Sequence, residues 1–340
     1  MEPYHTSTST SSLCQHCGRR PAQYLRAVSG ERLCLRCLFN SLERKVLKTI
    51  REQRLIAPGD YVAIAVSGGK DSLVLLHMLG KFRERGLLRD VKMEAFTINE
   101  GHPYSCFYRM ARRDYVKELA VKFGIEYNVY HFRDIFGVTA MELSERLARA
   151  GYEVHMCTID GVLRRRAMNL IGRRRGWTKI ATAHNLDDEA QTVLLNVLMG
   201  NLSRFRWYGT YEDAEEKDLI PRIKPLKYVR EEEIALYAHY HGLPLMELEC
   251  PYVVTNPRYN LKFMLAELER EMPSVKYNLV SFGEKLTRVL REAAPEAQPK
   301  RCKYCGASSA REICRVCELF EKASLLDIYL QNTKQAATNL

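Results

Sequence analysis

Four CxxC pairs hold eight of the eleven cysteines in this 340-residue chain. Sixteen residues separate the first two pairs, and eight separate the last two. Such spacing is typical of a zinc ion held by four thiolates, and a site with four protein ligands is closed and structural. Disulfides are the alternative, but they fit poorly with an N-terminus that shows no apolar signal segment. The sequence therefore predicts two structural zinc sites, formed by Cys14, Cys17, Cys34 and Cys37 and by Cys302, Cys305, Cys314 and Cys317.

A glycine turn, residues 67–72 with the sequence SGGKDS, lies between an apolar run and an apolar stripe. This order predicts a strand, a sharp turn and the start of a helix. Paired glycines let the backbone approach a ligand, and the amides at a helix N-terminus favour an anion. The spacing differs from that of the Walker loop, which needs four residues between its first glycine and its Gly-Lys pair. We expect this turn to bind phosphate groups.

Cys157 and Asp160 lie at the start of a segment that we expect to be helical to about residue 175. Three residues apart, they share one face of that helix. The N-terminal end of a helix lowers the pKa of a thiol and raises its reactivity. Arg164, one turn further on, is placed to meet phosphate. The arginine triplets 164–166 and 173–175 spread around the helix, and some of these side chains are expected to contact RNA phosphates.

Asp187 and Asp188 follow an apolar run at residues 179–183. Acidic residues in the first turn of a helix are stabilised by its dipole, which is a purely structural explanation. The functional alternative is a carboxylate pair that holds Mg²⁺ through water. Both interpretations stay open from the sequence.

The composition indicates a folded, basic protein. Apolar residues make up 46% of the chain, which supports a buried core, and the formal net charge is +11. The chain stays basic when two zinc sites are filled, and this suits a polyanionic partner such as nucleic acid. No run of eighteen apolar residues occurs, so we expect no membrane span and a cytoplasmic location.

The remaining pattern alternates strands with helices and predicts an α/β fold with a parallel sheet. Strands are expected at 61–65, 91–98, 126–132 and 179–183, and helices at 40–56, 105–123, 139–150, 157–175, 231–241 and 262–292, the last with a break at Met272-Pro273. Ligands of such sheets lie beyond the carboxyl ends of the strands, which makes Thr97 and Ile98 candidate adenine contacts. The expected units are a tail (1–12), a zinc module (13–40), a catalytic domain (41–296), a second zinc module (297–325) and a tail (326–340).

Together these motifs resemble the tRNA 2-thiouridine synthetases of the PP-loop ATP pyrophosphatase superfamily, and among them the TtuA and NcsA group. The resemblance rests on SGGKDS, CTIDGVLRRR at 157–166, TAHNLDD at 182–188, a later lone cysteine and the zinc modules at both ends. It implies a Rossmann-like PP-loop core, of the adenine nucleotide alpha hydrolase type, flanked by zinc ribbons. It also implies a sulfurtransferase that adenylates the uridine C2 carbonyl oxygen and replaces that oxygen with sulfur. The implied ATP contacts are Val66, Ser67, Gly68, Gly69, Lys70, Asp71, Ser72, Thr97, Arg164, Ala183 and Asp188, with Mg²⁺ on the phosphates.

In that family three cysteines hold an iron–sulfur cluster with one open iron. Two of them correspond to Cys157 and Cys250, but Asp160 stands where the family has the third. A carboxylate can bind iron, so Asp160 is expected to complete a 4Fe-4S or 3Fe-4S site. The resemblance gives catalytic roles to these three residues and to Asp71. The alternative is a cluster-free enzyme that uses a persulfide on Cys157.

Two other functions compete with thiolation. One is a tRNA ligase of the lysidine synthetase type, which needs no such cysteines; the other is an RNA-binding zinc protein without catalysis. The intact glycine turn argues against the second. The partners implied by the resemblance are tRNA, a ubiquitin-like sulfur carrier with a C-terminal thiocarboxylate or free sulfide, and a second copy of the chain in a homodimer.

Overall fold

The protein is described by a computed structural model that covers residues 12–105, 109–205, 208, 219–245, 252, 257–293 and 300–339. Its centre is a five-stranded parallel sheet with the strand order β5-β4-β3-β6-β7. The strands are β3 (Tyr61–Ala65), β4 (Lys92–Asn99), β5 (Glu126–His131), β6 (Lys179–Ala181) and β7 (Arg222–Ile223). The chain reverses direction across the sheet at β3, with β4 on one side and β6 on the other. Such a switch point opens a crevice at the carboxyl ends of the strands.

Alternating side chains of the sheet build two hydrophobic cores. Val62 and Ile64 pack with α1 (Leu35–Glu52), α2 (Lys70–Glu84), α4 (Arg113–Lys122) and α10 (Glu231–Tyr240). Tyr61 and Ala63 face the other core, which contains α5 (Phe132–Phe136), α6 (Ala140–Arg149), α7 (Met156–Arg175), α13 (Arg315–Lys322) and α14 (Leu326–Asn339). This period of two is the pattern of a strand buried on both faces. The predicted α/β architecture is confirmed.

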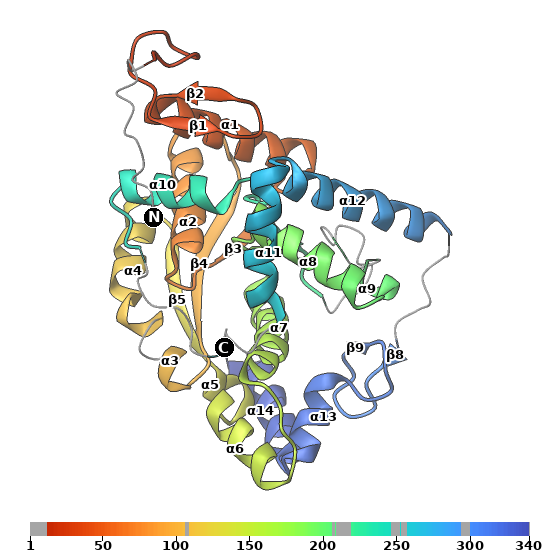
Figure 1. The fold of residues 1–340 in the computed structure, drawn as a ribbon. Helices are drawn as coiled ribbons and strands as arrows, with labels where there is room; N and C mark the ends of the chain where they lie inside the picture. The colour runs from red at the N-terminus through yellow and green to blue at the C-terminus, as the bar shows by residue number, and fades with distance from the viewer. Residues whose placement is uncertain are drawn as a thin grey trace.

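The two cysteine-rich modules lie at opposite ends of the molecule (Figure 1). The N-terminal module has the antiparallel hairpin β1 (Tyr24–Arg26) and β2 (Glu31–Leu33), and its cysteines join the core on the α2 face. The C-terminal module has the hairpin β8 (Lys300–Arg301) and β9 (Ser308–Ser309), and its cysteines join the core on the α7 face. Each module therefore packs against a different side of the sheet.

Three further helices form a satellite next to the sheet. Side chains of α8 (Leu186–Leu198), α11 (Pro257–Glu271) and α12 (Val275–Ala293) share a small core, and the short helix α9 (Leu202–Phe205) packs on α8 and α12. The short helix α3 (Pro103–Ser105) follows β4. The predicted break at Met272-Pro273 separates α11 from α12. The predicted helix 105–123 is shorter, because α4 begins only at Arg113. None of the helices in the described part of the chain is long and apolar enough to span a membrane.

The C-terminal segment differs from the expected tail at 326–340. Residues 326–339 form helix α14, which packs on α5 and α7. Tyr329 is fully buried there, and its hydroxyl accepts a hydrogen bond of 3.0 Å from Arg166 Nε. Apolar residues at 325, 326, 329 and 330 give this segment a helical stripe, which is the signal that could have identified it.

Candidate functional site

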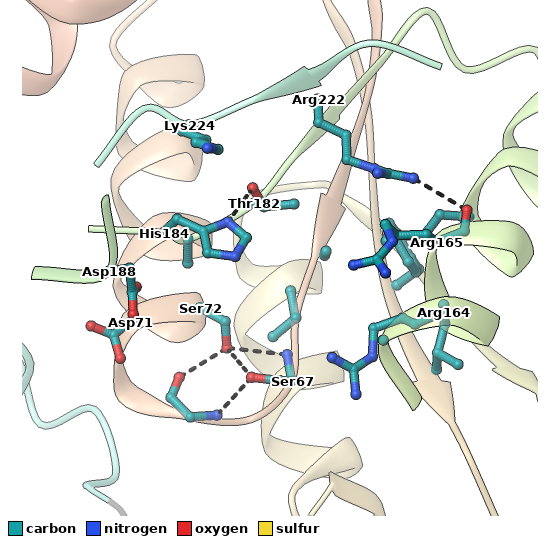
Figure 2. Close-up of a pocket in the computed structure, with 18 of the residues that line it drawn as sticks. Ser67, Asp71, Ser72, Arg164, Arg165, Thr182, His184, Asp188, Arg222 and Lys224 are labelled. Atoms are coloured by element: carbon teal, nitrogen blue, oxygen red, sulfur yellow. Dashed lines mark hydrogen bonds between the residues drawn. The ribbon is translucent and has the colours of Figure 1, made fainter. Parts of the chain in front are cut away.

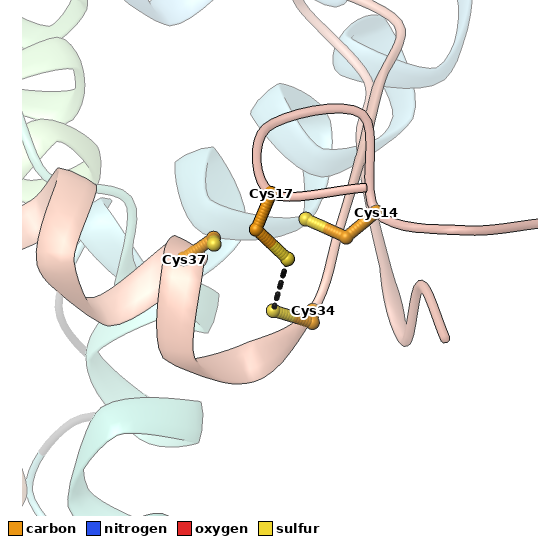
Figure 3. Close-up of side chains that lie close together, drawn as sticks. All are labelled: Cys14, Cys17, Cys34 and Cys37. Carbon is orange, nitrogen blue, oxygen red and sulfur yellow. Dashed lines mark hydrogen bonds between the residues drawn. The ribbon is translucent and has the colours of Figure 1, made fainter. Parts of the chain in front are cut away.

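The cysteines predicted to bind zinc form two tight groups. Within each group the four sulfur atoms all lie within 4.8 Å of one another, and Figure 3 shows the N-terminal set converging on one point. The Cys17 and Cys34 sulfurs are 4.0 Å apart, and those of Cys305 and Cys314 are 3.7 Å apart. Sulfurs on a tetrahedral zinc ion with bonds of about 2.3 Å lie about 3.8 Å apart. All eight cysteines are free thiols, so the geometry is that of a four-thiolate metal site.

Both groups are built by the same local device. The second CxxC pair begins a helix in each module, with Cys34 before α1 and Cys314 before α13. In the second module the Cys314 amide donates to the sulfur of Cys302 at 3.3 Å. Although burial opposes it, such backbone donors lower the pKa values of Cys14 and Cys302. They therefore favour the thiolate form that a metal requires.

A cavity of about 540 Å³ opens at the switch point of the sheet, between β3, β6 and α7 (Figure 2). This volume lies in the range of small-molecule sites. Of the expected ATP contacts, those that line the cavity are Val66, Ser67, Gly69, Asp71, Ser72, Arg164, Ala183 and Asp188. They come from the glycine turn, from the end of β6, from the first turn of α8 and from α7. The fold thus brings together segments that are more than 100 residues apart in the sequence.

The glycine turn is held open toward the cavity by its own hydroxyl groups. The Ser67 amide donates to Ser72 Oγ at 3.1 Å, and Ser72 Oγ donates to the Gly69 carbonyl at 2.9 Å. Gly68 has φ +83°, a left-handed conformation that costs other residues energy. Its carbonyl accepts a 3.0 Å hydrogen bond from Arg112, which therefore clamps the turn from outside.

Three expected ATP contacts, Gly68, Lys70 and Thr97, are not among the residues that line this cavity. Lys70 Nζ forms ion pairs with Asp71 at 3.1 Å and with Glu231 at 2.7 Å. Thr97 is buried and donates to the Val66 carbonyl at 2.7 Å, so it supports the turn from behind. Its neighbour Ile98 lines the cavity in its place.

Of the two aspartates 187 and 188, only Asp188 lines the cavity. Asp187 is buried and bound, because Oδ1 pairs with Lys276 and Oδ2 accepts the Glu231 amide at 2.8 Å. Burial and the nearby charges of Asp71 and Glu231 raise the pKa of Asp188 to about 7, against an opposing hydrogen bond from the amide of Asn185. Two half-buried carboxylates, Asp71 and Asp188, thus face the phosphate turn, and carboxylate oxygens of this kind suit Mg²⁺.

The sequence analysis missed the acidic partner of Arg164. Glu100, at the end of β4, is fully buried and binds Arg164 Nη2 at 2.8 Å and Arg109 Nη1 at 2.6 Å. Both arginines line the cavity. A buried carboxylate that binds guanidinium groups fixes their direction. Glu100 therefore holds the side chains of Arg109 and Arg164 at the wall of the cavity. Its position after a central strand was the available signal.

The start of α7 lies beside the cavity. Gly161 and Arg164 line it, and Cys157 lies one turn before Gly161, about 6 Å along the helix axis. The half-buried Cys157 thiol donates to the Tyr252 carbonyl at 3.6 Å. Asp160 is buried and lies 3.1 Å from Nε2 of His102. Cys250, the third expected ligand, lies outside the described residues.

Comparison with known proteins identifies relatives of this chain. Residues 39–254 match the family model described as a PP-loop domain. The chain is similar to cytoplasmic tRNA 2-thiolation protein 1 of Mus musculus (34% identity, covering 91% of this chain and 72% of the relative) and of Drosophila melanogaster (33%, covering 90% and 86%). It also resembles the solved structure of the U34-tRNA thiolase NcsA from Methanococcus maripaludis with its [4Fe-4S] cluster. In that case the TM-score is 0.77 and the identity 29%, over 91% of this chain and 96% of the other. The chain therefore belongs to the PP-loop family of tRNA 2-thiolation proteins.

Proposed function

We propose that this protein is an ATP-dependent tRNA uridine 2-sulfurtransferase. The observation that carries the proposal is the cavity between the phosphate turn on one side and α7 on the other, where the lining begins at Gly161, one helical turn after Cys157. The mouse and fly relatives are named for cytoplasmic tRNA 2-thiolation, which agrees with the expected location. The basic chain supplies a surface for tRNA phosphates.

The reaction has two steps. The target uridine leaves its stack, and its C2 oxygen attacks the α-phosphorus of ATP, so that pyrophosphate leaves. Sulfide then adds to C2, the C2–oxygen bond breaks, and AMP leaves with the oxygen. Uridine, ATP and hydrosulfide thus give 2-thiouridine, AMP and pyrophosphate without net oxidation. Arg164 and the turn amides stabilise phosphate charge. Asp71 and Asp188 would hold Mg²⁺, which would offset the charge of the pyrophosphate that leaves.

The donor set at the start of α7 fits an iron–sulfur cluster. Asp160 Oδ1 is buried without a hydrogen-bond partner among the described residues, and the Cys157 thiol lies on the same helical turn. Among the described residues, only the two four-cysteine groups hold their ligand atoms within 4.8 Å of one another. A cluster with an open iron supplies sulfide when bound, and we infer that Cys157, Asp160 and Cys250 hold it.

Chain connectivity supports the inclusion of Cys250. Only one residue separates it from Tyr252 in the sequence. Tyr252 itself contacts Cys157 and His102. The two four-cysteine groups hold structural zinc in this proposal. A homodimer and a thiocarboxylate carrier or free sulfide complete the expected system.

An ATP–pyrophosphate exchange assay with tRNA tests the first step. The wild-type protein is expected to exchange label only when tRNA is present, and Cys157→Ser is expected to retain exchange but form no 2-thiouridine. Absence of exchange in a folded, metal-loaded protein contradicts the proposal. Full thiolation without iron, with a disulfide formed between Cys157 and Cys250, supports the persulfide route, in which the second thiol releases sulfur from the first.

A further inference from the structure

A buried pair joins the end of β4 to the start of α7. His102 follows β4 and is 3% exposed, and Asp160 lies in the first turns of α7 and is 9% exposed. Nε2 of the histidine and Oδ2 of the aspartate are 3.1 Å apart. With Asp160 as the acceptor, Nε2 is the donor of this hydrogen bond. The two residues are 58 positions apart, so the pair depends on the fold.

The two oxygens of Asp160 have different environments. Oδ2 is held by His102, whereas Oδ1 is buried and has no hydrogen-bond partner in the described part of the chain. A buried carboxylate oxygen without a partner is unfavourable, because it has lost its hydrogen bonds to water. A ligand that binds Oδ1 removes this cost. The pair therefore fixes one oxygen and presents the other.

The same pair borders the reactive thiol. The ring of Tyr252 packs edge-on against the ring of His102, with 5.8 Å between centroids and 87° between planes. The carbonyl of Tyr252 accepts the hydrogen bond from Cys157 at 3.6 Å. His102 and Cys157 thus both contact Tyr252, and Asp160 is joined to His102. His102 follows strand β4, whereas Cys157 and Asp160 lie on α7.

We propose that His102 is a positioning residue, which holds Asp160 so that Oδ1 binds an iron of the cluster. The inference rests on the proposed function, because that function includes the cluster. Residues hydrogen-bonded to a metal ligand fix its orientation, and their loss costs about 10–100-fold in metal affinity. Asp160 offers a carboxylate where the family has a thiolate, and His102, which follows β4, fixes the direction of that carboxylate. Nε2 is directed at Asp160 Oδ2, so this nitrogen is not available to a metal while the hydrogen bond holds.

A double-mutant cycle tests this role. Iron and sulfide are measured per chain after anaerobic reconstitution, and iron loss to a chelator is followed optically in wild type, His102→Leu, His102→Gln, Asp160→Cys and Asp160→Cys/His102→Leu. We expect His102→Leu to lose iron about tenfold faster and His102→Gln, which retains an amide donor, to stay near wild type. In the Asp160→Cys background, His102→Leu should have no effect, because a thiolate needs no such partner. Circular dichroism and ATP binding verify folding.

Three results would contradict the inference. Equal iron loss from wild type and His102→Leu overturns the inference and leaves the proposed function intact. An equal effect of His102→Leu in both backgrounds overturns it as well, because the histidine then acts directly on iron or on the fold. A wild-type protein that binds no iron under any condition overturns both the inference and the cluster in the proposed function. The Gln variant keeps the test valid if the Leu variant does not fold.

Discussion

Thiols serve two different purposes in this molecule, and the contrast lies in how completely each site is closed. In each four-cysteine group three thiols are buried, four sulfurs lie within 4.8 Å, and backbone amides support them. At the start of α7, one half-buried thiol lies beside a carboxylate and next to a cavity of about 540 Å³. A metal with four protein ligands has no position left for a substrate, whereas an incomplete set leaves one. The number and burial of the ligands therefore distinguish a structural metal site from a reactive one.

The local device is nevertheless shared. Cys37 and Cys317 lie in the first turn of a helix, as Cys157 does. Each of these thiols therefore lies near the unpaired backbone amides of a helix N-terminus. The difference comes from the partners: CxxC pairs surround the first two, and His102 with Asp160 stands near the third.

The largest expected effect is that of Cys157→Ala. This thiol is half-buried and lies outside both zinc groups, so its removal should leave the melting temperature near that of the wild type. We expect thiolation to fall below detection, while the rate of ATP–pyrophosphate exchange stays within about twofold of wild type. Mercury-affinity electrophoresis of the tRNA measures the product. Loss of exchange in this variant would break the comparison, because Cys157 would then belong to the nucleotide site.

The matched change in a closed site is Cys317→Ala. This cysteine is fully buried among three other thiols, so its loss should release zinc and lower the free energy of unfolding by at least about 3 kcal/mol. Chemical denaturation and zinc analysis measure both. Exchange and thiolation should fall together, in proportion to the unfolded fraction; a stable variant with only thiolation lost would contradict a structural role.

The glycine turn offers a smaller test. Gly68→Ala places a side chain at φ +83°, which costs about 1–2 kcal/mol, and we expect ATP binding to weaken about tenfold. Gly59→Ala is the control, because Gly59 has φ +85° with open space around its Cβ position and does not line the cavity. Calorimetry should show normal affinity in the control. Equal loss in both variants would assign the effect to stability alone.

The smallest effect concerns Asp188. Its pKa in the folded protein is raised from 3.8 to about 7, chiefly by burial, so the folded state binds a proton that the unfolded state releases. The stability gained from this proton is complete below pH 4 and is lost as the pH rises through 7. Between pH 5 and 8, the unfolding free energy of the wild type should therefore fall relative to Asp188→Asn without nucleotide. Parallel pH profiles would contradict the raised pKa.

The sequence predicts the parts of this molecule that depend on local spacing. The CxxC pairs, the turn at 67–72 and the position of β3 are all short-range patterns, and the structure confirms them. Pairs formed by the fold itself are beyond such patterns. Glu100 binds Arg164 across 64 positions, and Lys276 binds Asp187 across 89. Helix α14 is a different case, because it lies in the segment 326–340 that we expected to be a tail, although an apolar stripe begins there.

The account depends most on an open iron site next to a nucleotide cavity, with closed zinc sites at both ends. Metal and sulfide analysis of the anaerobically reconstituted protein, before and after exposure to a chelator, tests this most directly. We predict about two zinc ions and about three to four irons per chain, with the iron removed first, thiolation lost, and zinc, fold and ATP–pyrophosphate exchange retained. Undiminished thiolation by a protein without iron would contradict the account.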